Sequence, residues 1–226
     1  MDNLHLRATC AALAGAAVLF AVIFIPAWTL DYWQGWAFFL MLMASTSLVT
    51  IYMALYDKPL LESRLRMGPG VEKTAVQKTI TSVGGVVFFG AFIIMVFDHR
   101  FGWSPAVPTF LSILGDVLGA LGMLIYFLVV KENHFAAATV DVVEGQTVVS
   151  TGPYVMVRHP MYAGAILVLF GAPLALGSWW GFLLTPITIG GFAWRLLDEK
   201  KYLCEHLPGY AEYARAVCFR LVPHIW

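Results

Sequence analysis

Long uninterrupted apolar stretches constrain the fold of this chain more than any other feature. Segments near 8–30, 33–56, 79–97 and 109–130 are each apolar over about 20 residues, and a fifth apolar region covers 161–197. A helix of this length crosses the hydrocarbon core of a bilayer. Of all residues, 60% are hydrophobic and 12% are charged. In a soluble domain about 45–50% of the residues are apolar and about 25% are charged. The sequence therefore predicts an integral membrane protein.

The region 161–197 is too long for one crossing. Its middle, GAPLALGSWWG, is rich in glycine and is followed by a second apolar run, so we predict a helical hairpin that turns near Gly177–Ser178. The expected fold is all-α, a multi-pass transmembrane helical bundle with about six crossings. No convincing small-residue cleavage site follows the first apolar run, which is therefore predicted to be a retained span.

Positive charge is concentrated on one side of this predicted topology. With six crossings, one side carries the N-terminus, segments 57–78 and 131–160 and the C-terminal tail. That side holds 13 of the 14 lysines and arginines: Arg7, Lys58, Arg64, Arg66, Lys73, Lys78, Lys131, Arg158, Arg195, Lys200, Lys201, Arg215 and Arg220. The other side holds only Arg100. Because lysine and arginine are enriched in cytoplasmic loops, both termini are predicted to be cytoplasmic. For a bacterial source the membrane would be the inner membrane.

Several classes of function are disfavoured by composition and motif content. The formal net charge is zero, so no basic field favours nucleic acid as a partner. The cysteines Cys10, Cys204 and Cys218 are odd in number and form no CxxC pair, which argues against a disulfide framework and a zinc site. His159 has no partner at metal-ligand spacing, and we expect no metal. Hydrolase, zinc-protease and P-loop signatures are absent from the sequence.

The fourth predicted span carries a small-residue stripe and one carboxylate. Gly115, Gly119 and Gly122 form a GxxxG-type pattern, which predicts close packing against another helix. Asp116 lies beside this stripe. An ionisable residue inside a span is a functional candidate, and the alternative is that Asp116 bonds a neighbouring helix.

The segment 146–164, QTVVSTGPYVMVRHPMYAG, combines turn chemistry with a helix start. Gly152 and Pro153 are incompatible with a regular helix, whereas Pro160 is suited to the first turn of one. The next helix is therefore predicted to begin near Pro160, with free backbone N–H groups and a positive dipole end that can bind a carboxylate or phosphate. Arg158 and His159 would add donors beside that end.

A second polar cluster lies where the last predicted helix leaves the membrane. Arg195 and Glu199 are four residues apart and share one helix face. Arginine before glutamate is the less stabilising order, so a bound ligand would explain the pair better than local support does. Both clusters also have an ordinary interpretation. In the first, Tyr154 and Tyr162 would be interfacial aromatics beside a basic anchor at the lipid headgroups. In the second, Arg195 and Glu199 would form a surface ion pair that contributes little energy.

Together these segments resemble the isoprenylcysteine carboxyl methyltransferase family and the wider group of membrane methyltransferases that includes phospholipid N-methyltransferases. The family pattern is GPY, then RHPxYxG, a helical hairpin, an Arg-x-x-x-Glu helix and a tail with two tyrosines. This chain matches it over about 131–226 with Gly152-Pro153-Tyr154, Arg158-His159-Pro160-Met161-Tyr162-Ala163-Gly164, Arg195, Glu199, Tyr210 and Tyr213. Met161 departs from prenylcysteine enzymes, which often have a small residue there. Lys200 and Lys201 likewise replace part of an acidic run.

The resemblance implies S-adenosylmethionine as the cofactor, bound without a soluble Rossmann domain. The sequence shows no internal repeat and no low-complexity linker, so we expect one domain over 1–226. Within it, the N-terminal spans lie in 1–130, and the resemblance places the cofactor-binding and catalytic region in 131–226. The residues expected to line the cofactor site are Gln146, Thr147, Val148, Val149, Tyr154, His159, Pro160, Met161, Tyr162 and Glu199. Arg195, the second expected catalytic residue beside Glu199, would face a lipophilic or small methyl acceptor at the cytoplasmic membrane face.

The chemistry of the acceptor stays open at the level of sequence. A carboxylate acceptor is already anionic and needs only an orienting cation such as Arg195, whereas an amine or thiol needs a base, for which Glu199 or His159 is available. An NADPH-dependent sterol reductase-like enzyme is a rival, although such enzymes usually have an asparagine where this chain has Met161. A non-enzymatic membrane scaffold or transporter is a third possibility, which predicts polar residues deep in several spans.

Overall fold

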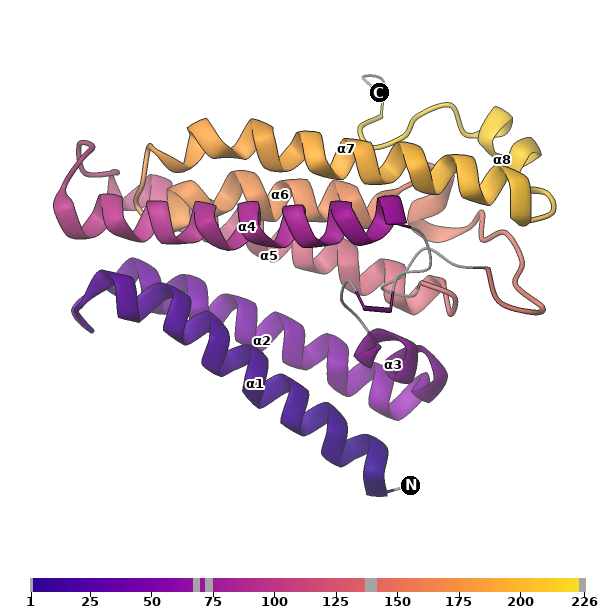
Figure 1. Ribbon diagram of the computed structural model, residues 1–226, viewed down its shortest axis with the longest axis horizontal. Coiled ribbons are helices and arrows are strands. Elements are labelled where there is room, and N and C mark those ends of the chain that lie inside the picture. Colours follow the sequence, from indigo (N-terminus) through magenta and orange to yellow (C-terminus); the bar gives the residue numbers. More distant parts are fainter. Residues whose placement is uncertain (1, 67–69, 72–74, 137–141, 224–226) are drawn as a thin grey trace.

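A computed structural model describes residues 2–66, 70–71, 75–136 and 142–223, and the described chain is all-helical without strands (Figure 1). Six helices of 16 to 27 residues form the bundle: α1 (Asp2–Ala27), α2 (Trp33–Tyr56), α4 (Ala75–Phe101), α5 (Thr109–Glu132), α6 (Pro160–Ala175) and α7 (Gly181–His206). The short elements are α3 (Lys58–Leu65), the 3-10 turn η1 (Gly152–Val155) and α8 (Tyr210–Ala216). Lys73, one of the charges assigned to the cytoplasmic side, lies outside the described residues.

Helices α1, α2, α4 and α5 are long and apolar enough to cross a membrane, which confirms the four spans predicted from the sequence. The predicted hairpin is also confirmed, since α6 and α7 are joined by residues 176–180. Gly177 there has φ +69°, a left-handed conformation that glycine adopts without steric cost. Helix α7 continues into the charged tail as far as His206, just before Pro208 and Gly209, because the residue before a proline disfavours helical backbone.

The two ends of the bundle differ in charge. Both chain termini, α3, α8 and the loop between α5 and α6 lie at one end in Figure 1, and the turn between α6 and α7 lies at the other. Arg100, the single basic residue assigned to the opposite side, lies near the C-terminal end of α4.

Helices α5 and α6 pack with their backbones almost in contact. A Cβ atom built on Gly115 would lie 2.5 Å from the carbonyl oxygen of Gly171, and one built on Gly122 would lie 2.4 Å from that of Gly164. The small-residue stripe of α5 therefore faces a matching stripe on α6, and the packing predicted from GxxxG is confirmed. Asp116 lies beside this seam, and its Oδ1 atom is buried without a hydrogen-bond partner among the described residues.

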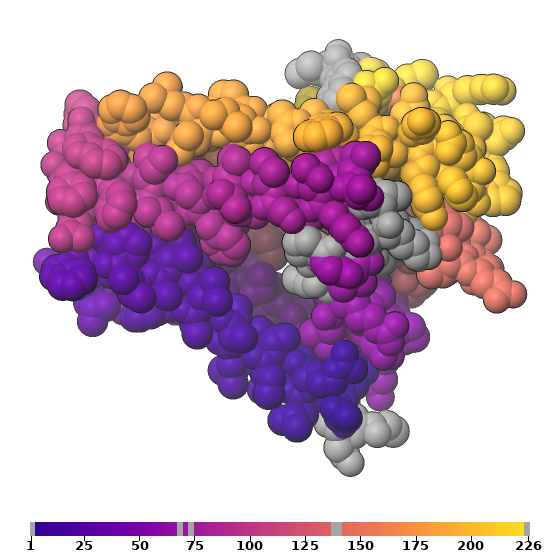
Figure 2. All heavy atoms as spheres, viewed as in Figure 1, coloured from indigo at the N-terminus to yellow at the C-terminus, as the bar shows by residue number. Residues whose placement is uncertain are grey.

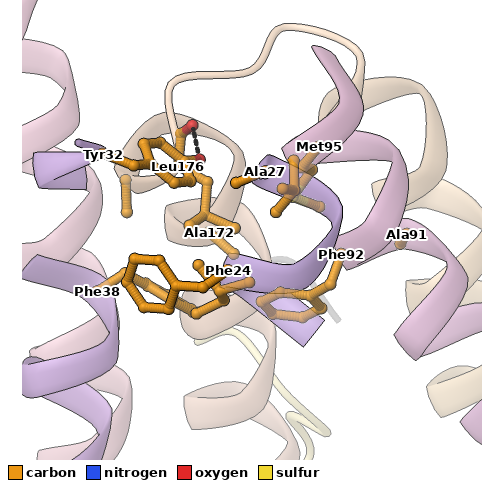
Figure 3. Close-up of a cluster of buried hydrophobic side chains, with 12 residues drawn as sticks. Phe24, Ala27, Tyr32, Phe38, Ala91, Phe92, Met95, Ala172 and Leu176 are labelled. Atoms are coloured by element: carbon orange, nitrogen blue, oxygen red, sulfur yellow. Dashed lines mark hydrogen bonds between the residues drawn. The ribbon is translucent and has the colours of Figure 1, made fainter. Parts of the chain in front are cut away.

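An aromatic cluster holds α1, α2, α4 and α6 together at the end that carries the α6–α7 turn (Figure 3). Phe24, Phe38 and Phe92 pack at its centre. The Tyr32 hydroxyl donates to the Leu176 carbonyl oxygen at 2.6 Å. Helix α4 packs on α1 and α7 and lies farther from α5 and α6, so space remains inside the bundle toward the charged end.

Candidate functional site

The space between α4, α5, α6 and α7 is a cavity of about 930 Å³. Pockets for small molecules typically measure about 300–1,000 Å³, so this cavity lies at the large end of that range. All eleven residues expected from the sequence to form the site line it: Gln146, Thr147, Val148, Val149, Tyr154, His159, Pro160, Met161, Tyr162, Arg195 and Glu199. The structure thus brings together two segments, 146–162 and 195–199, that are more than 30 residues apart in the sequence.

Tyr162 and Glu199 join the two helices of the hairpin across the cavity. The Tyr162 hydroxyl donates to Glu199 Oε2 at 2.6 Å, which links the first turn of α6 to the middle of α7. One turn earlier on α7, Arg195 Nη1 donates to the Thr81 hydroxyl of α4 at 2.8 Å. A carboxylate and a guanidinium are therefore held by fixed neighbours on one wall of the cavity, rather than at the lipid surface.

Pro160 is the first residue of α6 and His159 is its N-cap, as the sequence predicted. The backbone N–H groups of Arg158 and His159 donate to the carbonyl oxygens of Phe219 and Arg220, each at 3.0 Å. This pairing binds the C-terminal segment across the start of α6 and buries the side chains of both residues.

The guanidinium of Arg158 bonds the C-terminal tail, which the sequence did not predict, while its Nε stays buried without a partner among the described residues. Its guanidinium Nη2 donates to the Cys218 carbonyl oxygen at 3.0 Å, and Nη1 lies 3.5 Å from that of Ala214. The extended tail offers backbone acceptors that the sequence pattern did not reveal, and these capture the side chain. A basic anchor at the lipid headgroups is also wrong for Arg158, because only 8% of the residue is exposed.

His159 is a neutral imidazole in this environment. Burial and the nearby charge of Arg158, Arg220 and Lys200 lower its pKa to about 3. Its Nε2 atom lies 3.4 Å from the Tyr210 hydroxyl. An imidazole with this pKa is a weak base at neutral pH.

Tyr154 is fixed in the cavity wall by contacts at both ends. Asn133 Nδ2 donates to its hydroxyl at 2.8 Å, and the Tyr213 hydroxyl donates to its backbone carbonyl oxygen at 2.8 Å. Burial raises its pKa to about 12. Interfacial aromatics would present their hydroxyls to water, so the belt interpretation of Tyr154 is wrong.

The rest of the cavity is apolar and reaches into the helical bundle. Its lining there includes Val87 and Phe88 of α4, Met123 of α5, Val168 of α6 and Phe192 of α7. Thr46 of α2 and the exposed Val83 of α4 also line it. The surface is hollowed between α1 and α4 in Figure 2. The cavity thus has a polar end near the charged loops and an apolar end level with the spans.

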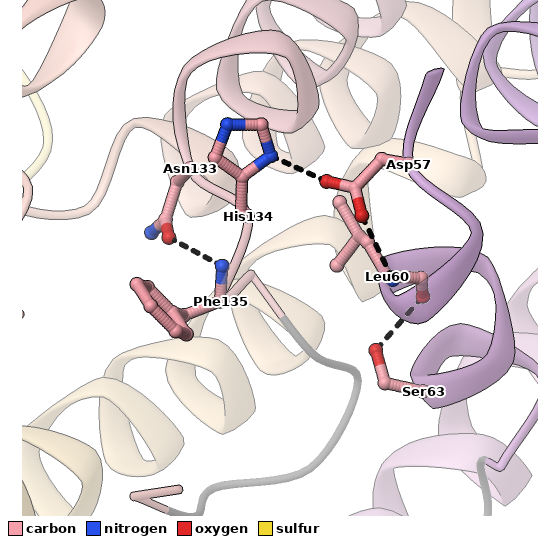
Figure 4. A network of polar contacts seen from close by, with 6 residues as sticks. All are labelled: Asp57, Leu60, Ser63, Asn133, His134 and Phe135. Carbon is pink, nitrogen blue, oxygen red and sulfur yellow. Dashed lines mark hydrogen bonds and ion pairs between the residues drawn. The ribbon is translucent and has the colours of Figure 1, made fainter. Parts of the chain in front are cut away.

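Sequence reasoning missed Arg64, which was counted only as a positive charge. Arg64 lies on α3 and lines the cavity. Burial lowers the pKa of its guanidinium. Helix α3 is held in place by Asp57, whose Oδ1 accepts from the Leu60 N–H at 3.1 Å and whose Oδ2 lies 2.5 Å from His134 Nδ1 (Figure 4). This pair joins the start of α3 to the loop after α5, a contact that sequence spacing gives no means to find.

No group of three histidine, cysteine or acidic side chains that could hold a metal occurs among the described residues. Residues 110–208, from the first turn of α5 to just beyond α7, match the family model described as phospholipid methyltransferase. That family is related to the isoprenylcysteine carboxyl methyltransferases, so the resemblance found in the sequence is confirmed. No curated protein matches the chain at a significant level.

Proposed function

We propose that this protein transfers a methyl group from S-adenosylmethionine to a lipophilic acceptor at the membrane. The match of residues 110–208 to the phospholipid methyltransferase family model supports this proposal. The observation that carries the proposal is the single cavity lined by all eleven residues expected from the motifs. Its polar and apolar ends match a water-soluble donor and a membrane-dissolved acceptor.

The residues at the polar end suit the cofactor. Aromatic faces attract a sulfonium cation, and Tyr154, Tyr162 and Tyr210 all line this end. The Glu199 carboxylate adds an opposite charge, and segment 146–149 forms the outer wall. The bound cofactor supplies an activated methyl group on a positively charged sulfur.

The reaction needs alignment and a dry site more than a covalent nucleophile. Arg195, held by Thr81, lies where it can orient an anionic or polar acceptor head group. Glu199 accepts a proton when the acceptor is an amine or thiol, because the low pKa of His159 leaves that imidazole a poor base. The apolar lining of α4, α5 and α7 holds the lipophilic part of the acceptor.

We place the polar end of the cavity at the cytoplasmic face. Four helices are long and apolar enough to span a membrane, and the start of α1 lies at the end that carries α3 and α8 (Figure 1). With α6 and α7 counted as crossings, the positive charges gather at that end, as the positive-inside rule requires.

Calorimetry on the purified protein in detergent tests the cofactor first. We expect S-adenosylhomocysteine to bind and NADPH not to bind. Binding of NADPH alone would favour a reductase and overturn the proposal.

Two variants then separate the roles of the paired residues on α7. Glu199→Gln is expected to abolish transfer and to weaken S-adenosylhomocysteine binding strongly, because it removes the negative charge that Tyr162 orients. Arg195→Ala is expected to abolish transfer and leave cofactor binding nearly unchanged. Glu205→Gln, at an exposed position on the same helix, is the matched control and should retain full activity. Full transfer in either site variant would remove that residue from the proposed site.

A further inference from the structure

Arg64 enters the cavity from α3, outside the segment that matches the family model. Its Nη2 atom lies 3.3 Å from Met161 Sδ, and its guanidinium carbon lies 5.3 Å from the centre of the Tyr126 ring. Both are soft neighbours, a thioether and an aromatic face. Neither neutralises a cation.

Within the described part of the chain, no carboxylate lies within ion-pair distance of Arg64. Its Nε atom is buried and has no hydrogen-bond partner there. Removing a charged group from water without an opposite charge costs several kcal/mol. Arg64 is partly buried, and the Glu199 carboxylate acts on it only from beyond ion-pair distance. Its buried Nε donor therefore remains suited to an anion that arrives from outside the chain.

The other basic side chains near this end have partners within the protein. Arg66, two residues away, is exposed and forms an ion pair with Glu62 at 2.8 Å. Arg158 is bonded to backbone carbonyl oxygens of the tail. Arg195 is bonded to Thr81. Arg158 also keeps a buried Nε without a partner among the described residues, but its other guanidinium nitrogens bond carbonyl oxygens. The hydrogen bond that Arg64 makes to a described residue goes instead to a thioether sulfur.

The contact with Met161 places Arg64 beside the start of α6. Met161 is the second residue of this 16-residue helix. A helix N-terminus favours an anion through its unpaired N–H groups and its dipole. The Nη atoms of Arg158, which was expected from the sequence to add donors at this end, bond the tail, whereas Arg64 reaches the same helix start from α3.

We propose that Arg64 binds the carboxylate of the amino-acid portion of S-adenosylmethionine, an inference that rests on the proposed function. We favour the cofactor over the acceptor as the ligand of Arg64, because Arg64 contacts Met161 and lies near Tyr154. Both residues belong to the wall of the cavity that is proposed to bind the cofactor. Arginine recognises a carboxylate through two parallel N–H donors, and Nε is one of the donors that remain free here.

The test compares two ligands that differ in the amino-acid portion. S-adenosylhomocysteine carries the carboxylate, whereas 5′-methylthioadenosine keeps the adenosine and the thioether without it. In Arg64→Gln we expect the Kd of S-adenosylhomocysteine to rise about tenfold to hundredfold, as for a lost charge-assisted hydrogen bond. The Kd of 5′-methylthioadenosine should stay within about twofold of its wild-type value. Arg66→Gln is the matched control and should bind both ligands like the wild type.

Unchanged binding of S-adenosylhomocysteine in Arg64→Gln would overturn the assignment. An equal loss for both ligands would also overturn it, because Arg64 would then only shape the pocket. Thermal unfolding checks that the variants are folded, and Arg64→Lys, which keeps the charge in the same space, should lose less affinity than Arg64→Gln. If the wild type itself binds neither ligand, the proposed function fails and not merely the role of Arg64.

Discussion

Replacing Gly171 with alanine tests whether the close contact of α5 and α6 organises the bundle. A Cβ atom at this position would lie 2.4 Å from the Gly115 carbonyl oxygen and 3.1 Å from the Gly119 nitrogen. Ordinary carbon contacts are about 3.5–4.0 Å, so the helices must separate locally by about 1 Å. Backbone atoms form the obstacle, and no side-chain rotation relieves it.

The expected loss follows from two opposing terms. Overpacking of a tight contact costs about 1–3 kcal/mol, whereas alanine in place of glycine favours the helix by up to about 1 kcal/mol. With the middle of the overpacking range, about 2 kcal/mol, and up to about 1 kcal/mol regained from helix propensity, the net destabilisation is about 1–2 kcal/mol. For a chain of this length each kcal/mol lowers Tm by about 2–4 °C, so we expect a decrease of about 2–8 °C.

Thermal unfolding in a mild detergent measures this shift. The matched control is Gly90→Ala on α4, where a Cβ atom has nothing within 4 Å and alanine should leave Tm unchanged or raise it. If Gly171→Ala and Gly90→Ala unfold at the same temperature as the wild type, close backbone packing of α5 on α6 does not stabilise the bundle.

Two further outcomes are expected. In the folded protein His159 has a pKa of about 3, against 6.5 for a free imidazole. It therefore contributes stability above pH 6.5 that is lost as the pH falls toward 3. His159→Gln should show a shallower loss of Tm between pH 7 and pH 5 than the wild type, and parallel curves of Tm against pH would contradict this. The Asp98 carboxylate, 2% exposed, accepts from the Ser104 N–H, the Ser104 hydroxyl and the Ser178 hydroxyl at 2.6–2.7 Å. Asp98→Ala should therefore destabilise the protein by about 3 kcal/mol or more, because the donors of Ser104 and Ser178 lose their acceptor. Asp31→Ala, at an exposed position, should change Tm little, and equal unfolding temperatures for the two variants would show that the buried network contributes nothing.

Much of the fold was readable from local patterns. The four spans and the hairpin follow from apolar length, because the bilayer fixes how many apolar residues a crossing needs. The start of α6 at Pro160 follows from the fixed backbone of proline. The glycine stripe of α5 indicated a close helix contact. Its partners, Gly164 and Gly171 of α6, were identified only from the tertiary structure.

The site was predictable where a motif concentrated its residues, and not where a residue acted from a distant segment. The cavity residues from Gln146 to Tyr162, with Arg195 and Glu199, follow from motifs within 131–226. Arg64 was missed because its place in the cavity depends on the Asp57–His134 contact, which joins residues 77 positions apart. Arg158 was misjudged for the same reason, since the tail that binds it lies about 60 residues away.

The sequence by itself determined which segments enter the membrane and which short motifs could carry chemistry, because hydrophobic length and turn chemistry act over neighbouring residues. Tertiary structure decided which charged side chains face the cavity and which are used to hold the chain together. Arg158 was turned toward backbone carbonyls and Arg64 toward a thioether and an aromatic ring. The physical reason is that a buried cation takes whatever partner the packing brings within reach, and only three-dimensional packing brings those partners near.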